Sequence, residues 1–261
     1  MTQKNVERMY LVGSDKMIYK KDMFEDNLYL DHLIHMLQSS RYMADKPEKV
    51  KKLIEKYKTY RKIGMKLNHK IMDKCLDRDT LKKSAKLLGI IRKGVFVFEN
   101  EDETSVLMDF ALNDYRFANK TVVERYREKY SWKNKVEKDI LDALTNSYTS
   151  LFKITAIKPL ENTLILKDLL NNKENNIKLI DIAFSKTLTE ENFLIFTRIL
   201  KFKDFNMTSG VSFLFPPDKE NYLIKQYNKK ISDIKLNNKT LGRFIIFYKL
   251  SKKHGLDVSY I

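Results

Sequence analysis

The sequence has very little of the residues that build disulfide-linked and cofactor-binding sites. It contains one cysteine, Cys75, and seven glycines in 261 residues. A single cysteine excludes an internal disulfide framework and an all-cysteine metal site, and it favours a reducing cytoplasmic location. No glycine-rich phosphate loop of the GxGxxG or GxxxxGK[ST] type occurs. We therefore expect no cofactor, and in particular no nucleotide cofactor.

Long apolar runs are also missing. No run approaches the roughly 18 residues that a membrane-spanning helix needs, and the first residues lack the apolar core of a secretion signal. We expect a cytoplasmic protein that does not bind membranes. Aromatic residues, in contrast, are abundant, with 14 Tyr, 15 Phe and one Trp. That content is typical of a globular core and excludes a disordered chain.

Positive charge is present in excess and is unevenly distributed. The net charge is +16, and lysines outnumber arginines by 40 to 10. Residues 49–93 contain 16 basic and 4 acidic residues, residues 217–261 contain 10 and 4, and charges in the rest of the chain nearly cancel. An AT-rich coding bias would explain lysine over arginine, but not this partition. Such an asymmetric surface attracts polyanions.

Hydrophobic periodicity divides the chain into three parts and predicts an α+β fold. Residues 1–148 have mainly helical spacing, residues 149–216 alternate with a period of two, and residues 217–261 return to helical spacing. The middle part predicts a five-stranded antiparallel small barrel or meander, of SH3-like or OB-like type. The C-terminal helices are expected to pack on the rest. Predicted helices span 24–42, 47–72, 80–88, 104–118, 121–130, 133–147, 218–230 and 239–253, and predicted strands span 95–98, 150–157, 162–170, 176–184, 192–202 and 206–215.

Local residue types predict where some elements begin and end. Pro47 suits the first turn of the long basic helix, where its missing N–H costs no hydrogen bond. Asp79 is the predicted N-cap of the next helix, and Gly89 is its predicted end. Asp168, Asp181 and Asp204 lie near strand ends, where aspartate most often satisfies local backbone N–H groups.

The β region also carries a resemblance. The segments SLFKI, LILKDLL, IKLIDIAFS, LIFTRIL and MTSGVSFLFP follow one another within it. Their pattern resembles a small β module of uncharacterised prokaryotic and phage proteins, with a "DLL" turn and a late "SG" turn. The resemblance implies the β fold and a prokaryotic or mobile-element origin, and it implies no activity.

The long basic segment supplies the candidate binding residues. Lysines neutralise phosphates and release counterions, which gives affinity with little sequence preference. Tyr57 and Tyr60 lie among these cations, but their helical spacing with Leu and Ile places them in the core. The candidate nucleic-acid contacts are Lys51, Lys52, Lys56, Lys58, Arg61, Lys62, Lys66, Lys70, Lys82 and Lys83.

A possible enzymatic motif lies near the C-terminus. Asp218 follows a proline, and Asp233 and Lys235 occur in the sequence Asp-Ile-Lys. This pattern resembles the PD-(D/E)xK nuclease signature, which implies two carboxylates that hold Mg²⁺ and a lysine that supports the hydroxide nucleophile. That family places these residues on paired strands, whereas the intervening segment here has helical spacing. The structural alternative is that Asp218 is the N-cap of a helix and that the charges after it are solvated.

Other side chains give weaker patterns. His32 and His35 lie three residues apart on a predicted helix, a spacing that can present two metal ligands. Two partly exposed helix histidines are the favoured explanation of this pair, so we expect no metal site.

Three functions remain open at this point. The leading hypothesis is a non-enzymatic basic accessory protein of a prokaryote or mobile element that binds nucleic acid or an acidic protein. A Mg²⁺-dependent nuclease is the second. The third is a protein-interaction module whose small barrel is the docking surface.

Overall fold

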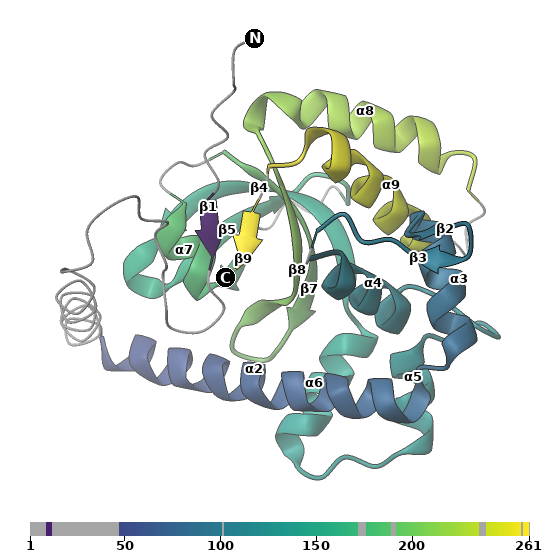
Figure 1. Cartoon of the computed structure of the whole chain (residues 1–261). Coiled ribbons are helices and arrows are strands. Elements are labelled where there is room, and N and C mark those ends of the chain that lie inside the picture. The colour runs from purple at the N-terminus through teal and green to yellow at the C-terminus, as the bar shows by residue number, and fades with distance from the viewer. Residues whose placement is uncertain are drawn as a thin grey trace, which may run out of the picture.

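A ring of five strands lies between two sets of helices. The computed structural model describes residues 9–11, 47–100, 102–171, 176–188, 192–234, 239–256 and 258–260. The long helix α2 crosses one side of the ring and α8 lies on the opposite side (Figure 1). The predicted helix at 24–42, with His32 and His35, lies outside the described residues. None of the helices in the described ranges is long and apolar enough to cross a bilayer.

Most of the helices predicted for the N-terminal part of the chain are present in the structure. Two details differ. Asp77, not Asp79, caps α3, because its side chain accepts the Thr80 N–H at 2.7 Å, whereas Gly89 ends the helix as predicted, with φ of 81°. The predicted strand at 95–98 is shorter and forms a hairpin with an unpredicted strand. The elements are α2 (Glu48–Cys75), α3 (Arg78–Leu88), β2 (Ile91–Arg92), β3 (Val95–Phe96), α4 (Asp102–Asn113), α5 (Val122–Lys129) and α6 (Lys135–Thr145).

All five predicted strands occur, but the sheet is mixed rather than antiparallel. The ring order is β4–β5–β6–β8–β7, and β7 pairs again with β4. The β6–β8 pairing is parallel and aligns only Leu179 with Asn206, so the ring is not quite a barrel. The predicted strand at 176–184 is cut short by helix α7. The elements are β4 (Tyr148–Lys158), β5 (Thr163–Asp168), β6 (Ile177–Ile180), α7 (Ile182–Thr187), β7 (Leu194–Lys201) and β8 (Asn206–Phe215).

Helix α7 explains why the strands close into a ring, which was one of the two predicted forms, and do not form an open meander. Asp181 accepts the Phe184 N–H at 3.0 Å and so begins the helix directly after β6. The chain then crosses the ring, so β7 pairs with β4 and β8. A helix therefore lies between the third and fourth strands of the ring, and the fifth strand pairs with the third.

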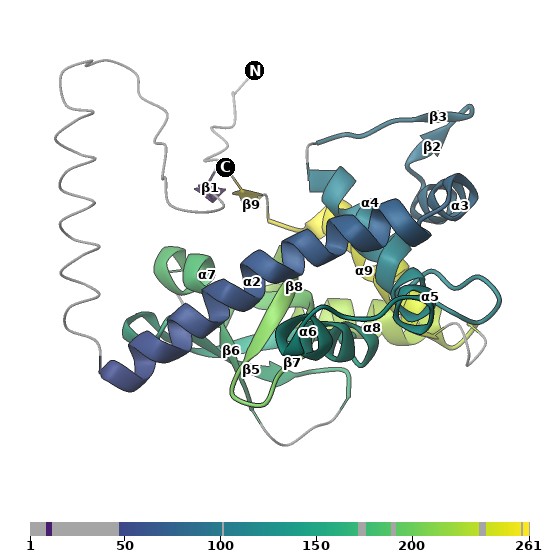
Figure 2. The same cartoon turned by 90° about the horizontal axis from the view of Figure 1, so that it is seen from below.

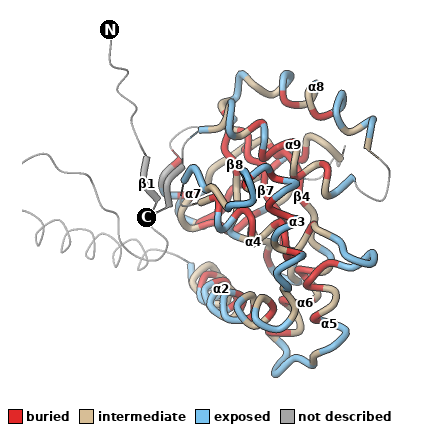
Figure 3. The backbone as a smooth tube through the Cα atoms, turned by 45° about the vertical axis from the view of Figure 1, so that its right-hand side comes forward, coloured by how far each residue is buried: buried red, intermediate tan, exposed pale blue. Residues whose placement is uncertain are grey.

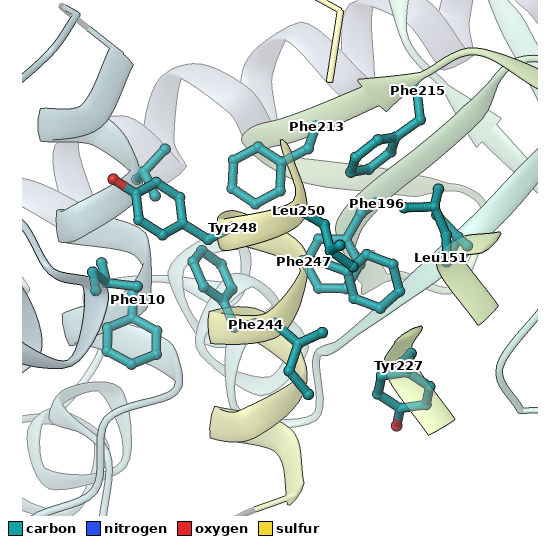
Figure 4. Close-up of a cluster of buried hydrophobic side chains, with 14 of the residues drawn as sticks. Phe110, Leu151, Phe196, Phe213, Phe215, Tyr227, Phe244, Phe247, Tyr248 and Leu250 are labelled. Carbon is teal, nitrogen blue, oxygen red and sulfur yellow. The ribbon is translucent and has the colours of Figure 1, made fainter. Parts of the chain in front are cut away.

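The C-terminal helices α8 (Glu220–Ile231) and α9 (Lys239–His254) confirm the prediction, and α9 is central to the largest core. The rings of Phe247 on α9 and Phe196 on β7 stack at 4.4 Å (Figure 4). The same core includes Phe110 of α4 and Tyr227 of α8. All three sequence segments therefore share one hydrophobic core. At the chain ends, β9 (Val258–Tyr260) pairs in parallel with β1 (Met9–Leu11).

A second core attaches α2 to the ring. Tyr57 and Tyr60 are buried, as predicted, and their rings meet Phe205 edge to face at 6.3 and 5.4 Å. Figure 2 shows α2 running across the described body, and Figure 3 shows that the helix has both buried and exposed positions. The aromatic residues thus fix the helix, while its lysines lie towards solvent or at its edges.

A buried ion triad joins the ring to α4. Arg198 of β7 donates hydrogen bonds to Asp109 at 3.2 Å and to Asp114, and its side chain and that of Asp114 are each 3% exposed. Arg198 also donates to the Ser147 hydroxyl at 3.3 Å. Burial and the Asp109 carboxylate raise the pKa of Asp114 to about 7, against the opposing effect of Arg198. The two central residues, Arg198 and Asp114, are almost fully buried, so we assign the network a structural role.

Candidate nucleic-acid interface

Helix α2 carries most of the candidate cations, and several of them already have acidic partners. Most of these pairs are exposed and add little stability, whereas Glu137 is buried; each carboxylate reduces the local positive potential. Lys51 is half-buried near the start of the helix. The pairs are Lys52–Glu48 at 3.7 Å, Lys56–Asp204, Lys58–Glu55 at 3.0 Å and Lys70–Glu137 at 2.7 Å.

Arg61 is directed into the fold. Its guanidinium donates to the carbonyl oxygen of Thr208 at 2.7 Å and to the hydroxyl of the same residue at 3.2 Å. It also lies 5.7 Å from the centre of the Tyr57 ring. These contacts fasten α2 to β8. Because the donors of Arg61 are occupied there, we assign it a positioning role within the interface.

Four of the ten candidates are exposed and have no acidic partner in the described ranges: Lys62, Lys66, Lys82 and Lys83. The last two lie on α3, where the structure adds Arg78 and Lys86, which sequence reasoning missed. Both are exposed and likewise form no ion pair with any described residue. Their spacing could have identified them, since positions four apart lie on one side of a helix.

The resulting row of Arg78, Lys82 and Lys86, with Lys83 beside it, is called here the α3 face. The only carboxylate on this helix is Asp79. Successive members of the row are separated by one helical turn, about 6 Å along the axis. The buried residues of α3 face the core instead, among them Ala85 and Leu88. The α3 face is therefore a compact cationic surface held rigidly by the core behind it.

An exposed aromatic residue borders the α3 face. Phe117 lies in the connection between α4 and α5, and 53% of its surface is exposed. The Lys83 ammonium and the Arg125 guanidinium lie 5.7 and 5.9 Å from the centre of its ring. Both distances are within the range of cation–π attraction. Phe117 was not a sequence candidate, because the sequence placed it inside the predicted helix at 104–118, whereas α4 ends at Asn113.

A tight turn presents Phe117. The N–H of Phe117 donates to the carbonyl oxygen of Lys120 at 3.0 Å, and the reverse bond is 3.1 Å. The two residues between them, Ala118 and Asn119, both have positive φ, of 51° and 64°. The Arg116 side chain also stabilises the turn by donating to the Asn119 carbonyl oxygen at 2.7 Å. The turn is therefore closed by hydrogen bonds on both sides.

The residues that support this turn are also fixed. Arg116 donates to both carboxylate oxygens of Glu124 at 2.9 and 3.1 Å. Glu124 belongs to a capping box with Thr121, which begins α5. Burial acts to raise the pKa of Asp77, but hydrogen bonds from Thr80 and Arg125 outweigh it and hold that pKa below its usual value. Asp77 is thus ionised at neutral pH and holds Arg125 near Phe117.

The possible nuclease residues are not brought together. Asp218 lies in a short 3-10 turn before α8, and Asp233 follows the end of that helix. A helix of 12 residues is about 18 Å long. Asp218 pairs with Lys219 at 2.7 Å and does not cap the helix, because the N-cap position is Lys219 without a side-chain bond. Lys235 lies outside the described residues.

The aspartates at strand ends are mainly local structure formers. Asp168 accepts the N–H groups of Leu170 and Asn171 at 3.1 and 3.2 Å, and Asp181 caps α7. Asp204 pairs with Lys56 at the surface. In the described part of the chain, no three His, Cys, Asp or Glu side chains are grouped so that they could hold a metal ion.

These features define an α+β protein with a five-stranded ring and a cationic helical face. Residues 51–261 match the model of a family described as "Family of unknown function (DUF7986)", and the chain belongs to this family. The match includes the α3 face, the ring and the C-terminal helices. No curated protein and no solved structure matches the chain.

Proposed function

We propose that this protein binds nucleic acid through the α3 face and the adjoining exposed side of α2. The observation that carries the proposal is the row of Arg78, Lys82 and Lys86, exposed and without acidic partners in the described ranges, beside the exposed ring of Phe117. Lys62 and Lys66 add two more such cations on α2. Phosphate oxygens are the ligands that such a surface attracts most strongly.

Binding of this kind has a measurable signature. Each phosphate that a cation neutralises releases counterions, so log K falls with log[salt] by about 0.9 per contact on duplex DNA. Four to six contacts would give a slope of about −4 to −5. Little sequence preference is expected, because phosphate contacts position a protein without reading bases.

The proposed role is that of an accessory protein that binds without cleaving its partner. The separation of Asp218 from Asp233 along α8 supports binding over the nuclease alternative. A prokaryotic or mobile-element origin belongs to the same proposal and depends on the resemblance of the β module.

Fluorescence anisotropy tests the proposal with labelled 20-nucleotide single strands and duplexes of DNA and RNA. At about 50 mM salt we expect binding, and at about 200 mM salt an affinity lower by about a hundredfold or more. Polyglutamate, added as a competitor, represents an acidic protein partner. Undetectable binding to every nucleic acid at about 50 mM salt would refute the proposal, and stronger binding to polyglutamate would favour the acidic protein.

A further inference from the structure

We infer that Phe117 is a stacking platform for an unpaired base, so that the preferred partner of the α3 face is a single strand. This inference rests on the proposed nucleic-acid binding and specifies its substrate class. Aromatic side chains bind bases by stacking in proteins that hold single strands, with cations along the backbone path. Phe117 and the α3 face combine these two elements.

Phe117 differs from the other exposed aromatic residues. Phe98 stacks on Phe96 at 6.2 Å, and Tyr222 packs against His254 at 4.9 Å. Trp132 has Lys138 5.5 Å from its ring, but that lysine is paired with Asp142 at 2.8 Å. Within the described ranges, no aromatic ring packs against Phe117.

Of the two cations beside Phe117, Arg125 is paired with Asp77 at 3.4 Å, but Lys83 is not neutralised by any described residue. Lys83 has no acidic partner in the described part of the chain, and it belongs to the α3 face. A base on the ring would therefore place its own phosphate next to an unpaired ammonium group. At Trp132 the neighbouring ammonium group of Lys138 is already neutralised by Asp142. Charge thus favours a nucleotide at Phe117 over one at Trp132.

The backbone under Phe117 is strained, which argues for a specific use. Left-handed backbone costs an ordinary L-residue about 1–2 kcal/mol. Ala118 and Asn119 both adopt it, and the cost falls mainly on Ala118 because asparagine tolerates this conformation. Glycine would remove this cost, but it would also loosen the turn. Strain of this kind is retained where the surrounding structure fixes it and is concentrated at functional sites. A fixed ring loses little entropy when a ligand binds.

Geometry favours a single strand over a duplex. The cations of the α3 face are spaced by about 6 Å, comparable with the separation of neighbouring phosphates in an extended strand. A strand could therefore follow α3 with one base on Phe117. In a duplex every base is already paired and stacked, and removing one costs a few kcal/mol.

Three variants and three probes test the inference. The variants are Phe117→Leu, which keeps an apolar side chain, Phe117→Tyr, which keeps the ring, and Trp132→Leu, which removes a comparably exposed ring elsewhere. The probes are labelled oligothymidylate of 15 nucleotides, the same strand with abasic sites, and a 15-base-pair duplex. Anisotropy at about 50 mM salt gives each affinity.

We expect Phe117→Leu to weaken binding of the single strand by about fivefold or more, because stacking contributes about 1–3 kcal/mol per base. Its affinity for the duplex should stay within about twofold, and its salt slope should be unchanged because no charge is lost. Phe117→Tyr and Trp132→Leu should bind like the wild type. The wild type should bind the abasic strand more weakly than the intact strand by a similar factor. This result does not depend on the folding of any variant.

Two results would overturn the inference. If Phe117→Leu and the abasic strand both leave single-strand affinity unchanged while salt dependence persists, stacking on Phe117 is refuted and the proposed function stands. If the wild type binds no strand or duplex at about 50 mM salt, both are refuted. Circular dichroism and thermal unfolding of each variant show that any loss of affinity is not a loss of fold.

Discussion

Arg198 and Asp114 are 84 positions apart in the chain, yet they form an ion pair whose side chains are each only 3% exposed. The pair joins β7 to the end of α4, directly before the turn that carries Phe117. Asp109 is the second carboxylate on the same guanidinium. A buried network therefore links the ring to the candidate interface, and its loss is expected to destabilise the fold.

Replacing Arg198 by methionine is expected to destabilise the protein by about 3–5 kcal/mol at pH 8, because it leaves buried carboxylates without a partner. Urea unfolding followed by circular dichroism measures this loss. Arg127→Met is the matched control, since Arg127 is exposed and pairs with Asp142 at the surface; its cost should be about 1 kcal/mol or less. Equal losses for the two variants would contradict the structural role of the triad.

The raised pKa of Asp114 predicts a pH dependence of stability. An unfolded aspartate has a pKa of 3.8, whereas that of Asp114 in the fold is about 7. Between these values the folded state keeps a proton that the unfolded chain releases, so the contribution of Asp114 to stability falls as pH rises from about 4 to about 7. Asp114→Asn removes this titration. We expect the difference in unfolding free energy between wild type and variant to decrease over that range; a constant difference would contradict the assignment.

Substitution of Arg61 tests whether this residue positions α2 on β8 or contacts phosphate directly. Arg61→Gln removes two hydrogen bonds to Thr208 and should destabilise the fold by about 1.5–3 kcal/mol, the range for bonds to a charged group. Its salt slope for DNA binding should match that of the wild type within experimental error. Lys62 is the next residue and lies on the exposed side of α2. Lys62→Gln should leave the stability of the fold unchanged and should reduce the salt slope of DNA binding. A slope reduced by about one unit in Arg61→Gln would show that Arg61 contacts phosphate.

Much of the fold could be predicted because periodicity and caps are local. Gly89 ends α3 at a positive φ, and the apolar spacing of Tyr57 and Tyr60 correctly placed them in the core. The mixed sheet could not be predicted, because β6 and β8 pair through a contact between distant segments. The apolar run after Ile180 fits a strand or a buried helix equally well, and only the cap at Asp181 decides for α7.

The candidate site was harder to predict than the fold. Charge counting found the segment 49–93, but it could not separate Arg61, which binds Thr208, from Lys62, which is exposed. Pairing with acids is decided by tertiary structure, as between Lys70 and Glu137. Phe117 depends on a turn and on neighbours from two other elements, so nothing in its own sequence marks it.

The most direct measurement compares two triple variants that each lower the net charge of +16 by the same amount. Arg78→Gln, Lys82→Gln and Lys86→Gln change the α3 face; Lys225→Gln, Lys229→Gln and Lys230→Gln change exposed lysines of α8, which lies across the ring from α2 (Figure 1). If the α3 face binds nucleic acid, the first variant should lose tenfold or more in affinity at about 50 mM salt and about three units of salt slope. The α8 variant should lose much less. Equal losses in the two variants, or an unchanged affinity in the first, would contradict the proposed interface.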